Sequence, residues 1–394
     1  MLLPSKYVRY VFFYLAIVNS LGVGAQNTAN PSTYALLWEI SGRDLSQPSF
    51  LFGSMHVRES AAFNFPDSLG GYLRSCTAFA NEVHLDSAMI RMLEVYLGKE
   101  EPQIDEDYLR ALSTIKVGED FMPPRTGATK TPSLWSSLTR QLGHKRDTIH
   151  YPTFLDAYLM EYARCQGLRL YGLEEIDEHL YEPGDESGKG FSIFERALFQ
   201  LQDYYYAGDI TEIGYLVAEQ GPHFDQMALV PRNYVMCRRI KEILRTEKAL
   251  FAVVGAAHLP GKTGLVQLLR EEGYQLRPIP ADRDSRSPAD SLLGKILCQR
   301  EWPKQVGGRG GYHFTFPFAQ CFERSAGASS QYLGYDIGQG LSYLLLTDRF
   351  LPYQFEDFET RFFTDDGYQI EANEPITVAG LEGRRYELFR PDED

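Results

Sequence analysis

Two stretches with the same ending decide how this chain folds: Phe50-Leu51-Phe52-Gly53-Ser54-Met55-His56 and Val253-Val254-Gly255-Ala256-Ala257-His258. In each, a short apolar run stops at a glycine, and a histidine follows three residues later. Such a run predicts a buried strand that has reached its carboxyl end. Open α/β sheets bind ligands beyond the carboxyl ends of their strands, so we expect His56 and His258 to face one crevice.

Glu82 is the third candidate for this crevice. It stands near the end of a predicted strand at 78–83, where a carboxylate is costly unless it is paired, hydrated or bound to a metal. Two imidazoles and one carboxylate form a ligand set for zinc or another divalent ion. The alternative is a solvated glutamate at the sheet rim. His84 lies on the same strand face, and we expect it to support the ligands rather than to be one.

Two more residues are candidates for catalysis. Glu174 follows Gly172-Leu173 at the end of another predicted strand, so we expect it at the same crevice, as a general base or as a further ligand. Arg232 lies in Pro231-Arg232-Asn233 and is a candidate for orienting a substrate carbonyl or carboxylate. A surface salt bridge is the alternative for Arg232.

The pattern along the chain predicts two domains. Residues 35–279 alternate strand and helix patterns after an opening hairpin, which predicts an α/β domain with a mixed sheet flanked by helices. Residues 280–290 are polar and proline-punctuated, so we expect a linker. Residues 291–394 contain strand patterns between glycine turns and one helical pattern at 353–362, which predicts a small α+β domain of unknown role.

Composition and the amino terminus restrict partners and location. The 394 residues carry a formal net charge of -14 without a basic stripe, which argues against nucleic acid because phosphate contacts need clustered Lys and Arg. Residues 1–25 have the basic start, apolar stretch and small residues of a signal peptide. A membrane anchor is the alternative, but the apolar stretch is shorter than the ~20 residues of a span. We therefore expect a periplasmic or secreted protein that is not inserted in the membrane after cleavage.

The cysteines do not define a scaffold. The chain has five, at positions 76, 165, 237, 298 and 321, and they show no Cys-x-x-Cys metal spacing. Cys298 and Cys321 could pair in an oxidising compartment, and we expect the other three to be buried and inert.

These residues resemble the TraB/PrgY/GumN family. The resemblance rests, in chain order, on Leu37–Gly42, Phe50–His56, Glu82-Val83, Tyr171–Glu174, Pro231–Asn233 and Val253–Gly261. The family is similar to the Tiki proteins, membrane-tethered metalloproteases with two Gly-x-x-His motifs and a glutamate. It is also related in fold to erythromycin esterases and to the haem-binding ChaN lipoproteins. The resemblance implies His56, Glu82 and His258 as core site residues, with Glu174 and Arg232 auxiliary.

Together these features predict a metal-dependent hydrolase. A divalent ion (Mn, Co or Zn) held by His56, Glu82 and His258 is expected to acidify a water, which attacks an amide or ester carbonyl of a peptide or small molecule. Glu174 is expected to take the proton and Arg232 to position the substrate. Two alternatives stay open. One is a metal-free esterase of the erythromycin-esterase type, and the other is a binding protein for haem or a peptide without chemistry. The oligomeric state is not predicted.

Overall fold

A computed structural model gives the arrangement of the chain. It describes residues 35–66, 69–96, 151, 153–175, 200–220, 226–279, 286–288, 303–306, 313–315, 322–326, 329–338, 341–347, 369–378 and 380–389. The expected signal peptide, the helical pattern at 353–362 and the cysteine pair 298 and 321 lie outside these residues. In the described ranges, no helix has the length and apolar character to cross a membrane.

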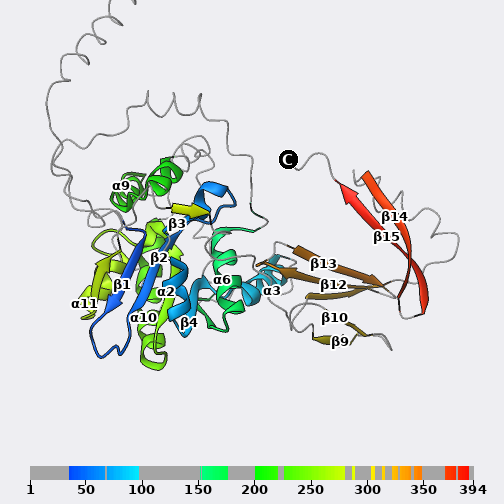
Figure 1. Cartoon of the computed structure of the whole chain (residues 1–394), viewed down its shortest axis with the longest axis horizontal. Coiled ribbons are helices and arrows are strands. Elements are labelled where there is room, and N and C mark those ends of the chain that lie inside the picture. The colour runs from blue at the N-terminus through cyan, green and yellow to red at the C-terminus, as the bar shows by residue number, and fades with distance from the viewer. Residues whose placement is uncertain are drawn as a thin grey trace, which may run out of the picture.

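A six-stranded mixed sheet forms the centre of the first domain (Figure 1). Its strands are β1 (Leu37–Ser41), β2 (Ser49–Ser54), β4 (Ala78–Val83), β5 (Arg169–Glu174), β6 (Leu250–Gly255) and β7 (Gln275–Pro278). They stand in the order β5-β4-β6-β2-β1-β7. β1 pairs antiparallel with β2 and β7, whereas β2, β4, β5 and β6 run parallel to one another. The predicted hairpin and mixed sheet are confirmed.

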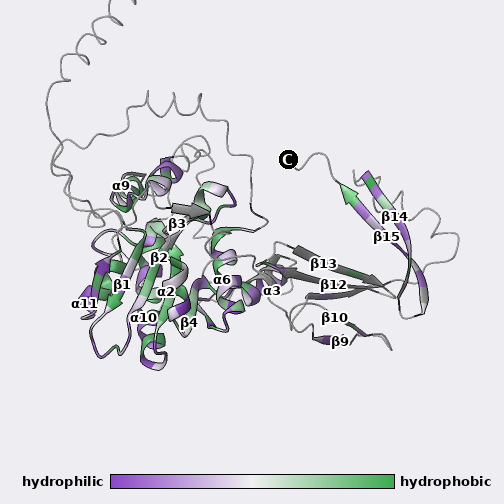
Figure 2. Cartoon of the chain, viewed as in Figure 1, coloured by the Kyte–Doolittle hydropathy of each residue, from purple (hydrophilic) through white to green (hydrophobic). Residues whose placement is uncertain are grey.

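Helices cover both faces of this sheet. They include α2 (Leu69–Ser75), α3 (Leu85–Tyr96), α6 (Leu155–Cys165), α9 (Ile210–Gln220), α10 (Gln226–Thr246) and α11 (Leu265–Glu271), together with the short 3-10 helices η1 (Ser60–Phe63) and η3 (Ala256–His258). Side chains of β6 alternate between the two faces. Phe251 and Val253 belong to the core that contains α2 and α6, and Ala252 and Val254 belong to the core that contains α10 and α11. Because both faces are buried, the central strands are mainly hydrophobic (Figure 2), and the polar Asn81 and Glu82 stand near the carboxyl end of β4.

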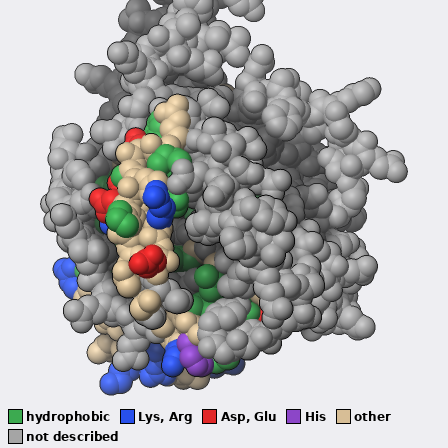
Figure 3. Space-filling view, turned by 90° about the vertical axis from the view of Figure 1, so that its right-hand side faces the viewer, with side chains coloured by type: hydrophobic (Ala, Val, Ile, Leu, Met, Phe, Trp, Pro, Cys, Tyr) green, Lys and Arg blue, Asp and Glu red, His purple; other side chains and the backbone are tan. Residues whose placement is uncertain are grey.

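The expected linker contributes a strand to the first domain. β8 (Arg286–Pro288) pairs antiparallel with β3 (Asn64–Pro66). Beyond it, the described residues form β9 (Lys304–Val306), β10 (His313–Thr315), β11 (Phe322–Ala326), β12 (Ser329–Asp336), β13 (Leu341–Thr347), β14 (Gln369–Val378) and β15 (Leu381–Phe389). β11, β12 and β13 form one sheet, and β14 and β15 form a separate ribbon. On the face shown in Figure 3, the described acidic, basic and apolar side chains are interspersed.

The cysteines differ from expectation at one position. Cys76 and Cys237 are free and buried, as predicted. Cys165, at the end of α6, is disulfide-bonded, so its prediction as an inert thiol is wrong. The prediction failed because disulfide formation depends on which cysteines lie close together in the folded chain, and the spacing of cysteines in the sequence does not show this.

The two free thiols should resist alkylation. Burial raises the pKa of Cys76 to about 12 and that of Cys237 to about 11, and the thiolate is the reactive form. We expect iodoacetamide at pH 8 to leave both unmodified in the native protein and to label both in urea. Peptide mass spectrometry measures this. Rapid native labelling of either cysteine would show that its thiol is accessible to solvent and not buried.

Candidate functional site

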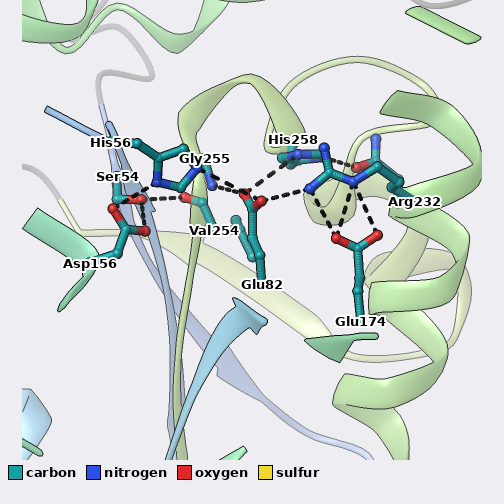
Figure 4. A network of polar contacts seen from close by, with 10 residues as sticks. Ser54, His56, Glu82, Asp156, Glu174, Arg232, Val254, Gly255 and His258 are labelled. Atoms are coloured by element: carbon teal, nitrogen blue, oxygen red, sulfur yellow. Dashed lines mark hydrogen bonds and ion pairs between the residues drawn. The ribbon is translucent and has the colours of Figure 1, made fainter. Parts of the chain in front are cut away.

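The site lies at the edge of the sheet where β2, β4, β5 and β6 all end (Figure 4). Ser54 at the end of β2 is in register with Gly255 at the end of β6, and Val83 of β4 is in register with Glu174 of β5. Since these strands are parallel, their carboxyl ends meet at one edge. The structure brings His56, Glu82, Glu174 and His258 together there, and α10 contributes Arg232.

Glu82 is the centre of the site. Its Oε1 accepts a hydrogen bond from the backbone N–H of Gly255 at 2.5 Å, and its Oε2 accepts one from Arg232 Nη2 at 2.6 Å. His56 Nε2 lies 3.8 Å from Oε2, and His258 Nε2 lies 3.5 Å from Oε1. Burial opposes ionisation of this carboxyl, but the neighbouring His258 and Arg232 outweigh burial and hold the pKa of Glu82 well below its usual range.

His56 is oriented by a buried aspartate. Its Nδ1 lies 2.9 Å from Asp156 Oδ2, and the Ser54 hydroxyl donates to the other oxygen of Asp156 at 2.6 Å. The Asp156 charge raises the pKa of His56 well above its usual value, against the lowering effect of burial. Asp156 therefore holds the Nδ1 side of the His56 ring. The side chain of His56 is nevertheless 54% exposed, so solvent can still reach the ring.

His258 is oriented in the same way from the other side. Its Nδ1 lies 2.6 Å from Asn233 Oδ1, and the Asn233 amide donates to the Thr263 carbonyl oxygen at 2.8 Å. This second contact fixes which way the Asn233 amide points, so its oxygen faces the ring and Nδ1 carries the proton. Unlike His56, His258 is buried.

Arg232 joins two carboxylates. It donates from Nε to both oxygens of Glu174 at 3.1 Å and from Nη2 to Glu174 Oε2 at 2.9 Å. Burial acts to lower the pKa of Arg232, but Glu174 and Glu82 raise it above its usual value. The side chain of Glu174 is 0% exposed. The salt bridge that was the alternative for Arg232 is thus present, but it is a buried ion pair rather than a surface one.

Three contributors were not predicted from the sequence. Asp156 is on α6, 100 residues from its partner His56, and Asn233 and Ser54 were not assigned polar contacts. A signal for Asp156 existed, because it stands inside an apolar helical pattern, Phe154-Leu155-Asp156-Ala157-Tyr158-Leu159. The structure buries every residue of α6 from Leu155 to Ala163, and a carboxylate in such a helix needs a partner. The described contact of His84 is with Ser87, where its Nδ1 lies 3.3 Å from the hydroxyl oxygen. A supporting role for His84 stays a prediction.

Two glycines allow the histidine segments to approach each other. A Cβ on Gly53 would lie 2.7 Å from Leu259 Cδ1. A Cβ on Gly255 would lie 3.0 Å from Glu82 Oε1, 3.5 Å from His258 Cδ2 and 3.9 Å from His56 Nε2. The space left by the missing Cβ of Gly255 is therefore surrounded by the three side chains that the sequence had singled out.

The comparisons with known proteins bear on the same residues. No curated protein and no solved structure matches the chain. The TraB/PrgY/gumN family, in contrast, matches residues 36–278. This range runs from β1 to β7 and includes every residue of the site. Because the match covers more than half of the sequence and the whole of the domain that carries these side chains, the chain belongs to the TraB/PrgY/gumN family.

Proposed function

We propose that this chain is a hydrolase of amides or esters, and that His56, Glu82 and His258 hold a divalent ion at the sheet edge. One observation carries the proposal. Two histidines from separate parts of the chain have Nδ1 committed to Asp156 and Asn233, while each Nε2 lies 3.5–3.8 Å from an oxygen of Glu82. Histidines that ligate a metal typically hold the second ring nitrogen on such a partner.

The donor set fits a divalent ion in kind. Two imidazole nitrogens and a carboxylate suit Mn, Co or Zn. Ligands at ~2.1 Å from one tetrahedral ion lie about 3.4 Å from each other, near the spacings to Glu82. The space at Gly255 faces all three side chains. Among the described residues, however, no three His, Cys, Asp or Glu side chains already stand in metal-holding geometry. Ion binding therefore requires these side chains to shift, with Glu82 offering the lone pairs that its hydrogen bonds to Gly255 and Arg232 do not use.

The other residues of the site act by orientation. Such an ion, when bound, would polarise a carbonyl or acidify a bound water. Asp156 and Asn233 keep the Nε2 atoms of both rings directed at Glu82. Arg232 fixes one oxygen of Glu82, and Glu174 fixes Arg232. Glu174 as general base and Arg232 as substrate anchor remain predictions, and both require this ion pair to open.

The decisive experiment measures ion content and hydrolysis together. After reconstitution with manganese, cobalt or zinc, we expect about one ion per chain in the wild type and in His313→Ala, a control at an exposed histidine of β10. His56→Ala and His258→Ala should lose both the ion and hydrolysis of a peptide and ester panel while keeping the circular dichroism of the wild type. Full activity in both variants would sink the proposal.

Gly255→Ala tests the centre of the site with one methyl group. The added carbon would lie 3.0 Å from Glu82 Oε1, in the space that we assign to the ion. We expect a loss of ion affinity of about 10-fold or more, with a change in unfolding free energy near 1 kcal/mol. Gly71→Ala is the matched control, because its Cβ meets nothing within 4 Å. Isothermal titration and urea unfolding measure the two effects. Unchanged ion affinity in Gly255→Ala would place the ion elsewhere.

A metal-free hydrolase of the erythromycin-esterase type is the second candidate. It is favoured by the half-exposed imidazole of His56 on the buried Asp156, the arrangement of a general base with its orienting carboxylate. In this version His56 Nε2 takes a proton from the attacking water and returns it to the leaving group. Hydrolysis that survives exhaustive chelation but is lost in Asp156→Asn would select it over the ion-dependent form.

We also propose that the protein is exported. The disulfide at Cys165 supports this, because disulfides persist in oxidising compartments. Mass spectrometry of the protein recovered outside the cytoplasm should show a chain that lacks about the first 25 residues. An intact amino terminus on that material would contradict signal cleavage.

A further inference from the structure

Helix α6 connects the site to the C-terminal region. Asp156, the second residue of α6, holds His56 at 2.9 Å. The backbone carbonyl of Asp156 accepts from Asn81 of β4 at 3.4 Å, and α6 packs against β4 and β5. The position of Asp156, and with it the orientation of His56, depends on where the first turn of α6 stands.

The C-terminal region is fastened to this helix at two described points. Just before α6, the Thr153 hydroxyl donates to the carbonyl oxygen of Ile337 at 2.5 Å. Gly338 lies directly on Glu161, in the middle of α6. A Cβ at Gly338 would stand 2.6 Å from Glu161 Oε2 and 2.7 Å from Glu161 Cβ. Both contacts come from one turn, Ile337-Gly338, which follows β12.

Neighbouring contacts strengthen the attachment. α3 contacts β11 and β12 of the C-terminal sheet, as the side-by-side elements in Figure 1 show. α3 is also tied to α6, because Asp86 and Arg164 form an ion pair at 2.7 Å. The last residue of α6, Cys165, is disulfide-bonded. α6 is thus held at its start, its middle and its end.

We infer that the C-terminal region is a positioning element for the site, in which the turn Ile337-Gly338 holds α6 so that Asp156 orients His56. Thr153 precedes Asp156 by three residues, less than one helical turn. A shift at Thr153 therefore reaches Asp156 with no flexible segment in between. The positioning of His56 stands on the contacts alone, and its consequence for catalysis rests on the proposed hydrolase function.

The test perturbs the turn in the full-length protein. Gly338→Ala places a methyl group against Glu161, and Thr153→Val removes the hydrogen bond to Ile337 at nearly constant shape. Gly383→Ala is the matched control in the same region, because its Cβ would meet Ile376 Cγ1 at an ordinary 3.7 Å. If Gly338→Ala does not fold, Thr153→Val decides.

Two measurements that need no substrate give the outcome. The first is hydrogen exchange of α6, with α11 as internal reference. The second is the ¹⁵N signal of the His56 ring, assigned with His56→Gln. We expect α6 to exchange about 10-fold faster or more and the His56 signal to shift in both turn variants, but not in Gly383→Ala. Unchanged α6 exchange overturns the inference, and so does faster exchange with an unchanged His56 signal. If the wild type hydrolyses nothing, the proposed function fails while these two measurements still decide the positioning role.

Discussion

Replacing Glu82 by glutamine is expected to destabilise the protein by about 3 kcal/mol and to weaken ion binding by about 100-fold or more. Both oxygens of Glu82 accept hydrogen bonds, one from the Gly255 N–H and one from Arg232. A glutamine side chain has one acceptor oxygen and one donor NH2 group. In Glu82→Gln, the buried NH2 group would therefore face another donor, either the Gly255 N–H or Arg232. The lost charge also leaves Arg232 with Glu174 as its remaining carboxylate in this network.

The matched control for this variant is Glu39→Gln. Glu39 also lies on a strand of the sheet and pairs with an arginine, because its Oε2 accepts from Arg277 Nη2 at 2.8 Å. That arginine is 71% exposed, so we expect a change below about 1 kcal/mol. Urea unfolding and isothermal titration compare the two variants. Equal behaviour of Glu82→Gln and Glu39→Gln would mean that the Glu82 network does not hold this edge together.

Replacing Arg232 by methionine is the second substitution for which we expect a large loss of stability. Glu82 and Glu174 share Arg232 Nη2 at 2.6 and 2.9 Å, so the variant leaves two buried carboxylates close together without their common cation. We expect a loss of about 3–5 kcal/mol in unfolding free energy. Arg277→Met, at the exposed pair with Glu39, should cost less than about 1 kcal/mol. Urea unfolding of both variants measures the difference.

A double-mutant cycle separates the charge effect from the lost packing of the arginine. Glu174→Gln in the Arg232→Met background removes one of the two opposed charges, so the double variant should be more stable than the sum of the single effects by about 1–3 kcal/mol. Additive effects would show that the ion pair does not couple the two residues.

The part of the site that was predictable depends on local patterns. Gly53 and Gly255 end apolar runs that could be recognised as buried strands, and parallel strands carry their carboxyl ends to one edge. His56, Glu82 and His258 were expected together for this reason, and the structure places them together. Their role as metal ligands remains a proposal.

The polar partners of these residues were not predictable in the same way. Asp156 lies 100 residues from His56 and faces it because α6 packs over β4. Arg232 was expected to meet a substrate, yet its described contacts are with two glutamates. These pairings depend on the order of the strands in the sheet and on the packing of α6 and α10 against it. The sequence separation between the paired residues does not predict either pairing.

The sequence by itself therefore determined the strand ends and the meeting of His56, Glu82 and His258 at one edge of the sheet, because these follow from short-range hydrophobic periodicity and from the glycines that stop it. Its motifs carried the resemblance to the family, which the match over residues 36–278 confirms. Only the tertiary structure decided which nitrogen of each histidine is held, which cation balances Glu82 and that Cys165 forms a disulfide. The physical reason is that buried polar groups take the partners that close packing brings within 3 Å, however far apart they lie in the chain.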